Sequence, residues 1–198
     1  MIYISLAANS GKSYGTAVEA AKSFDHVHII DSGQVCGGEG LLVMHTAKLA
    51  MQGKTTEDII KSVNREKNRV VSKYIMPSIG IFYQNGYTGK LMMQICRLLQ
   101  LHPVLQMKKS RITITGVMIG DMKKARKQLV RYTLSHKSKI DEEAVFASHA
   151  ALSIKEQNEL KETINSCVSF DQLYFNRTSF STACNVGLGA FGLAYFKK

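Results

Sequence analysis

Short apolar runs and amphipathic stretches alternate along the first 76 residues of the chain. Three strands (residues 3–6, 26–30 and 70–76) alternate in this prediction with three helices (residues 13–24, 41–51 and 56–68). Strands that are separated by helices indicate parallel βαβ units. We therefore predict an α/β domain with a parallel sheet of three strands over residues 1–78.

The second half of the chain follows a different pattern. Strands at residues 104–107 and 111–119 flank the tight basic turn Lys108-Lys109-Ser110, which predicts an antiparallel hairpin. Asp121 is a good N-cap for a basic helix that ends near residue 137. The remaining predicted elements are helices at residues 91–101 and 154–167 and strands at residues 144–147 and 172–175. We predict an α+β domain with a mixed, largely antiparallel sheet over residues 79–198.

The composition is that of a globular protein. The 198 residues are 45% hydrophobic and 21% charged, which excludes a disordered chain. No apolar run approaches the roughly 20 residues of a membrane-spanning helix, and no export signal is recognisable. The four cysteines are widely spaced, so we expect reduced thiols in a cytoplasmic protein, with no metal site and no cofactor.

Positive charge is concentrated in one segment. The formal net charge is +11, and residues 107–140 carry ten basic side chains against the single acid Asp121. The predicted basic surface lies on the helix in this segment and comprises Lys123, Lys124, Arg126, Lys127 and Arg131. Such a patch predicts an acidic partner, either a membrane surface, a protein or a nucleic acid. Nucleic acid is the disfavoured alternative, because only Tyr132 is available in this segment to stack on bases.

Two glycine-containing loops are candidates for ligand contact. Ser10-Gly11-Lys12-Ser13 resembles a phosphate loop, but the required earlier glycine is replaced by Leu6. The loop is therefore either an anion site at a helix N-terminus or a capped βα turn. Residues 187–192 match Gly-x-Gly-x-x-Gly, but too little chain follows for a dinucleotide fold. Residues 37–40, which include three glycines, are predicted to be a flexible lead-in to a helix.

The order of these motifs resembles the DegV family of bacterial fatty-acid-binding proteins. The resemblance covers essentially the whole chain and rests on the following pieces: Ile4-Ser5-Leu6, Ser10-Gly11, Tyr14, Ile30-Asp31-Ser32, Gly40-Leu41-Leu42-Val43, Asn85-Gly86, Leu98-Leu99, Pro103-Val104-Leu105, Lys124-Ala125 and Gly187-Leu188-Gly189-Ala190-Phe191-Gly192-Leu193. It implies a Rossmann-like first domain, and a long-chain fatty acid held between the two domains. It also implies a protein that is not an enzyme and presents the acid to a separate fatty-acid kinase.

The implied lipid-binding residues come from the two ends of the chain. They are Asn9, Ser10, Gly11, Ser13, Asn185, Gly187 and Gly189. The chain departs from the family pattern at this site, because Ala7 and Ala8 replace paired serines and Asn185 replaces a histidine. Tyr87 and Gly120 replace two arginines, and the family's first segment, with a strand and a carboxylate-binding threonine, is missing. The resemblance therefore predicts a degenerate head-group site.

Two functions follow from these observations. The first is a fatty-acid-binding protein with an altered head-group site, and the second is an interaction protein that uses the basic face. An enzyme ranks third, because no nucleophile can be paired with a base in the sequence. A truncated parallel sheet exposes an edge, so we also expect a second copy of the chain, or another chain, to cover it.

Overall fold

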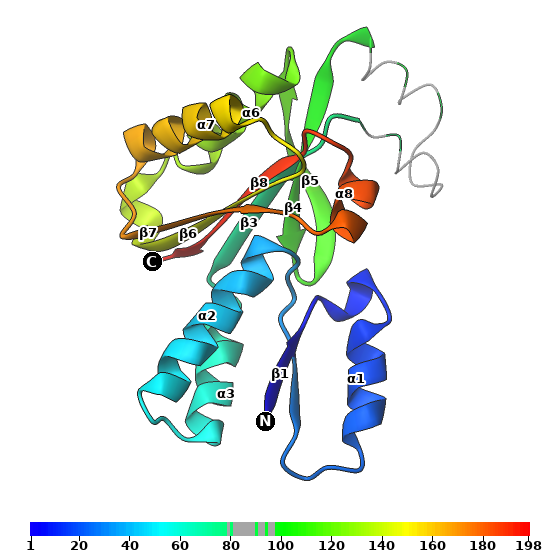
Figure 1. Cartoon of the computed structure of the whole chain (residues 1–198), viewed down its shortest axis with the longest axis vertical. Coiled ribbons are helices and arrows are strands. Elements are labelled where there is room, and N and C mark those ends of the chain that lie inside the picture. Colours follow the sequence, from blue (N-terminus) through cyan, green and yellow to red (C-terminus); the bar gives the residue numbers. More distant parts are fainter. Residues whose placement is uncertain (79, 81–89, 91–93, 95–97) are drawn as a thin grey trace.

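The computed structural model describes residues 1–78, 80, 90, 94 and 98–198 (Figure 1). At the N-terminus, β1 (Ile2–Ser5) pairs in parallel with β2 (His28–Asp31). The short 3-10 helix η1 (Ala8–Ser10) and the helix α1 (Ser13–Ala21) connect the two strands. This arrangement confirms the predicted parallel βαβ unit and its Rossmann-like character.

Two further helices join this unit to the rest of the molecule. These are α2 (Gly37–Met51) and α3 (Thr56–Glu66), which begins at its N-cap Thr55. Leu41 and Leu42 of α2 are fully buried, and they share an apolar cluster with Ile30 of β2 and Ala194 of the second sheet. The helix α2 therefore packs between the two sheets and fixes one against the other (Figure 1).

The second sheet has six strands in the order β5-β4-β3-β8-β6-β7. Its strands are β3 (Val70–Ile75), β4 (Leu101–Lys108), β5 (Arg111–Ile119), β6 (Ile140–His149), β7 (Gln172–Arg177) and β8 (Phe191–Lys197). All neighbouring strands are antiparallel except β6 and β7. The prediction of a mixed, largely antiparallel sheet is confirmed, as is the hairpin that turns at Lys109 and Ser110, both of positive φ.

The strand β3 corrects the sequence prediction. We predicted it as the third strand of the parallel sheet, but it pairs antiparallel with β4 and β8. An apolar run identifies a strand without identifying its partner strand. Both faces of β3 are covered here, because Ile75 packs in the core under α6 and Val70 packs in the cluster under α2. The division at residues 78/79 stays a prediction, although β3 belongs to the second sheet.

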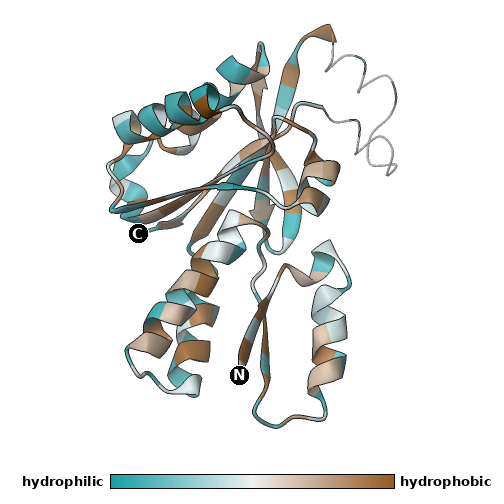
Figure 2. Cartoon of the chain, viewed as in Figure 1, coloured by the Kyte–Doolittle hydropathy of each residue, from teal (hydrophilic) through white to brown (hydrophobic). Residues whose placement is uncertain are grey.

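Helices cover both faces of this second sheet. The first face carries α6 (Met122–Thr133) and α7 (Ile154–Cys167), with Asp121 as the predicted N-cap of α6. Their colouring is mostly hydrophilic, as expected for helices with one face toward solvent (Figure 2). The opposite face carries α2 and the short helix α8 (Phe180–Val186). The helix predicted over residues 91–101 lies largely outside the described residues, and Leu101 begins β4.

The outer edge of β1 leads to a prediction about assembly. Within the described residues β1 pairs only with β2, and an apolar groove of about 400 Å³ lies between β1 and α1, lined in part by Tyr3 and Phe24. An unpaired edge beside exposed apolar side chains favours pairing with another strand. We expect light scattering to give a mass above the 22.0 kDa of one chain, falling upon dilution. A constant 22.0 kDa at high concentration contradicts this prediction.

Candidate functional site

The loops at the carboxyl ends of β1 and β2 are joined by hydrogen bonds. The Ala7 amide donates to the Gln34 carbonyl at 2.7 Å. The Asp31 carboxylate accepts from the amides of Ala8 and Gly33, at 3.1 and 2.8 Å. This network holds the η1 turn against the loop over residues 32–36, at the edge of the sheet where ligands of open α/β sheets bind.

The first group of predicted lipid-binding residues lies at this edge. Asn9, Ser10, Gly11 and Ser13 are all exposed, on η1 and at the start of α1. The N-cap residue Lys12 provides no side-chain cap, and a helix leaves its first N–H groups without intrahelical acceptors. The arrangement leaves hydroxyl and amide donors facing solvent, which is the chemistry that a carboxylate requires.

The second group lies on α8 and the turn that follows it. The exposed Asn185 side chain donates to the Ser181 carbonyl at 3.0 Å. Gly187 and Gly189 have φ values of +84° and +90°, which side chains rarely adopt. A Cβ at Gly187 lies 3.1 Å from Pro77, and the Gly189 carbonyl accepts a hydrogen bond from Arg126. Both glycines are therefore required by the turn itself.

The loop over residues 32–36 links the two groups. Cys36, with a φ of +50°, precedes α2, and its thiol lies near the Thr182 side chain of α8. Burial raises the pKa of this thiol, and the nearby Glu39 carboxylate raises it further, so the thiol stays protonated at neutral pH. No hydrogen bond connects residues 9–13 with residues 185–189 in the described part of the chain, so their meeting around a ligand stays a prediction.

The glycines at residues 37–40 are not a flexible lead-in, as we predicted, but the first turn of α2. A Cβ at Gly37 lies 2.8 Å from the Phe146 Cβ, and one at Gly38 lies 2.8 Å from the Gln34 side chain. The helix therefore needs glycine to approach β6 closely. We did not predict these contacts, the position of Cys36 or the short helix α8 from the sequence. Ser179 was nevertheless a recognisable N-cap for α8.

An apolar cluster lies beside this junction on the second sheet. It contains the buried residues Met76, Leu105, Ala150 and Ala190, and Ala183 and Val186 of α8 pack against it. Two cavities in the described part of the chain, one at the carboxyl ends of β6 and β7 and one between β1 and α1, are lined by neither group of predicted lipid-binding residues. No cluster of three or more potential metal ligands occurs in the described ranges. In the same ranges no helix is both long and apolar enough to cross a membrane.

The basic surface is only partly as predicted. Lys123, Lys124 and Arg131 are exposed on α6, as expected, and Lys127 is half-buried. Lys123 and Lys127 both pair with Glu159 of α7, at 2.9 and 2.7 Å. These contacts, with Lys127 contributing most, lower the pKa of Glu159 to about 2. Placing Arg126 on this surface was wrong, because its side chain is 4% exposed and pairs with Glu156.

A family model described as "Uncharacterised protein, DegV family" matches residues 1–198. The chain belongs to the DegV family. A DegV domain-containing protein of Staphylococcus aureus is 23% identical over 202 residues, covering 100% of this chain and 71% of the relative. Another from Clostridium acetobutylicum is 25% identical over 193 residues, covering 96% of this chain and 66% of the relative.

Solved structures of DegV proteins share the fold. A DegV family protein from Eubacterium eligens loaded with heptadecanoic acid has a TM-score of 0.85 at 14% identity, covering 100% of this chain and 72% of that one. The Streptococcus pneumoniae Fatty Acid Kinase (Fak) B3 protein loaded with linoleic acid has a TM-score of 0.84 at 18% identity, with coverage of 100% and 71%. The DegV fold of the two sheets is thus confirmed over the full length of the chain.

Proposed function

We propose that this DegV family member binds a long-chain fatty acid and acts as a binding protein, not as an enzyme. The observation that carries the proposal is the full-length family match, together with solved DegV proteins that hold heptadecanoic and linoleic acid. The carboxylate would lie where η1, the loop over residues 32–36 and α8 approach one another. The tail would follow the apolar cluster around Met76 and Leu105.

The head-group site would rely on neutral donors. The amides of Ala7 and Ala8 already donate to Gln34 and Asp31, so neither is free for a ligand. The hydroxyls of Ser10 and Ser13 and the first amides of α1 remain, with the second amide proton of Asn185. A dehydrated carboxylate requires such donors, because burying an unpaired charge is costly.

The tail would supply most of the affinity. Each methylene group that leaves water contributes about 0.8 kcal/mol, so a chain of sixteen or more carbons offsets a weakened head-group site. Specificity for a carboxylate would then depend on few hydrogen bonds. A degenerate head-group site and a working acyl site are therefore compatible in one protein.

Presentation of the bound acid to a separate fatty-acid kinase in the cytoplasm is the further part of this proposal. It is supported by the structural similarity to the Streptococcus pneumoniae Fatty Acid Kinase (Fak) B3 protein and by free thiols at Cys36, Cys167 and Cys184 in the described residues. The alternative is an interaction protein that acts through the basic face. That face has fewer unpaired positive charges than predicted. Three of the five basic side chains already pair with glutamates of α7.

The direct test is ligand identification followed by thermal unfolding. We expect mass spectrometry of the purified chain to release a long-chain fatty acid, and linoleic acid to raise the Tm of delipidated protein. At a hundredfold excess over Kd, the gain of about 2.7 kcal/mol corresponds to a Tm increase of about 5–10 °C. Ser13→Ala should reduce this increase, because it removes a hydroxyl from the head-group site.

The matched control is Ser23→Ala, which removes an exposed hydroxyl just beyond the other end of α1. It should leave the Tm increase unchanged. Recovery of buffer components alone, with no Tm response to linoleic or heptadecanoic acid, contradicts the proposal. Equal losses in Ser13→Ala and Ser23→Ala contradict the placement of the carboxylate while leaving lipid binding itself intact.

A further inference from the structure

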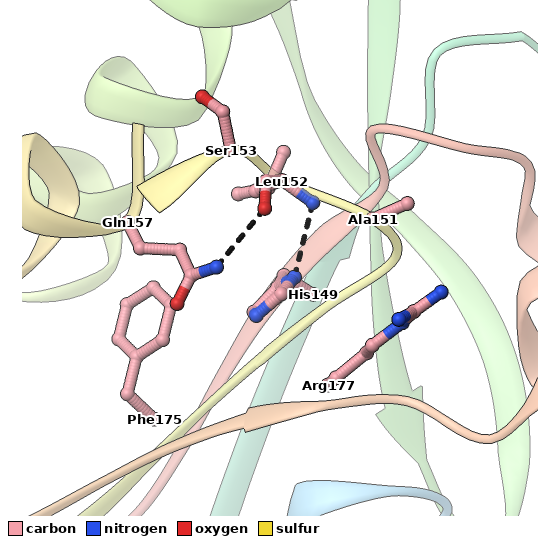
Figure 3. A pocket seen from close by; sticks show the side chains of 7 residues that line it. All are labelled: His149, Ala151, Leu152, Ser153, Gln157, Phe175 and Arg177. Carbon is pink, nitrogen blue, oxygen red and sulfur yellow. Dashed lines mark hydrogen bonds between the residues drawn. The ribbon is translucent and has the colours of Figure 1, made fainter. Parts of the chain in front are cut away.

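A polar cavity of about 560 Å³ opens at the carboxyl ends of the parallel strands β6 and β7 (Figure 3). The connecting helix α7 begins at the rim of this cavity, where Ser153 is its N-cap. Ligands of open α/β sheets bind beyond the carboxyl ends of parallel strands, and a helix N-terminus attracts anions. Position alone establishes no site, and the side chains in the cavity decide whether an anion can bind.

His149 contributes a buried donor to this cavity. Its side chain is only 4% exposed, and its Nδ1 accepts a hydrogen bond from the Leu152 amide at 3.2 Å. A neutral ring that accepts at Nδ1 carries its proton on Nε2. Burial lowers the pKa of His149, which favours this neutral form. No residue of the described ranges accepts from Nε2, which lies on the side of the ring away from Leu152 (Figure 3).

Arg177 places a positive charge at the wall of the same cavity. His149 and Arg177 are direct register partners on β6 and β7, so their side chains share one face of the sheet. Arg177 is exposed at the cavity wall, and within the described residues no carboxylate pairs with it. Lys161 adds a second cation, with its Nζ 5.2 Å from the centre of the Phe175 ring.

The nearest negative charge is already compensated. Glu156, in the first turn of α7, caps the helix through Ser153 and pairs with Arg126. Its hydrogen bonds with Ser153, and then the charge of Arg126, lower its pKa, so it stays ionised but paired. The cavity therefore presents an uncompensated guanidinium and an unpaired N–H, with Phe175 and Leu152 as apolar walls.

We propose that His149 and Arg177 form a binding site for the phosphate or carboxylate group of a small organic anion. His149 Nε2 would donate one hydrogen bond and the Arg177 guanidinium would contribute charge and further donors. Phe175 and Leu152 would contact the organic part. This site is separate from the proposed fatty-acid site: the neighbouring residue Ser148 faces Gly37 of α2, so His149 points to the opposite face of the sheet.

The test is an NMR titration of the full chain with phenyl phosphate, inorganic phosphate and benzoate. We expect phenyl phosphate or benzoate to shift the His149 side-chain nitrogens and the Leu152 amide. Arg177→Gln should weaken binding about tenfold or more, since it removes a charge-assisted hydrogen bond. His149→Asn should do the same, because asparagine can still accept from the Leu152 amide but has no donor at the Nε2 position.

Arg111→Gln is the matched control, because it removes an exposed arginine from β5, at the other edge of the same sheet. It should change the affinity less than twofold, which excludes a general effect of net charge. Inorganic phosphate binding as tightly as phenyl phosphate identifies the free ion as sufficient and still supports the anion site. The proposal is overturned if none of the three anions shifts these resonances, or if Arg177→Gln binds like the parent chain.

Discussion

Arg126→Met is expected to lower the free energy of unfolding by about 3 kcal/mol. The Arg126 side chain is buried, pairs with Glu156 through Nη2 and donates from Nη1 to the Gly189 carbonyl at 3.0 Å. Methionine preserves the apolar contacts of the side chain but leaves the Gly189 carbonyl without this donor and the Glu156 carboxylate with only the hydrogen bonds from Ser153. Removing one partner of a buried ion pair costs far more than the pair contributes, because the other charge remains.

The controls for this substitution lie on the same helix. Lys124→Met and Arg131→Met each remove an exposed charge and should change stability by less than about 0.5 kcal/mol in urea denaturation.

The loss of unfolding free energy caused by Arg126→Met should become smaller in acid. Glu156 has a lowered folded-state pKa, so its stabilising contribution is present above pH 4.5 and lost as the pH falls through that folded value. Equal effects of all three substitutions contradict a structural role for Arg126.

The basic helix shows what sequence periodicity can predict. Ala125, Leu129 and Thr133 recur at helical spacing and form a buried inner stripe. Arg126 is adjacent to this stripe and was assigned to the surface because charged residues are usually solvated. Its partner Glu156 lies 30 residues away and belongs to α7, and local pattern carries no information about such a pair.

The elements near the proposed lipid site show the same limit. Each predicted strand and helix outside residues 79–97 was found, because alternation and capping are local properties. The assignment of β3 to the parallel sheet failed because pairing depends on β8, more than 100 residues later. The glycines at the start of α2 looked flexible, whereas Phe146 of β6 makes Gly37 and Gly40 necessary and the Gln34 side chain makes Gly38 necessary. A motif therefore identifies a special backbone position without showing what approaches it.

Gly192→Ala is the second substitution expected to have a large effect, of about 3 kcal/mol in the free energy of unfolding. Gly192 lies in β8 directly opposite Tyr74 of β3, and a Cβ there falls 2.1 Å from the Tyr74 ring. The ring cannot move away freely, because the Tyr74 hydroxyl donates to the Val35 carbonyl at 2.8 Å. We expect the same substitution to weaken the response to linoleic acid, since Val35 belongs to the loop over residues 32–36.

A double-mutant cycle separates this steric cause from a general intolerance of alanine in β8. In a Tyr74→Ala background the ring is absent, so Gly192→Ala should cost at least 2 kcal/mol less than in the parent chain, measured by urea denaturation. Tyr74→Phe keeps the ring but removes its hydrogen bond to Val35, so it should retain only part of the penalty. Gly15→Ala is the matched control in open space on α1, where alanine should stabilise by about 0.5–1 kcal/mol. A Gly192→Ala penalty that is the same with and without the Tyr74 ring contradicts the proposed contact, and the link between β8 and the ligand loop fails with it.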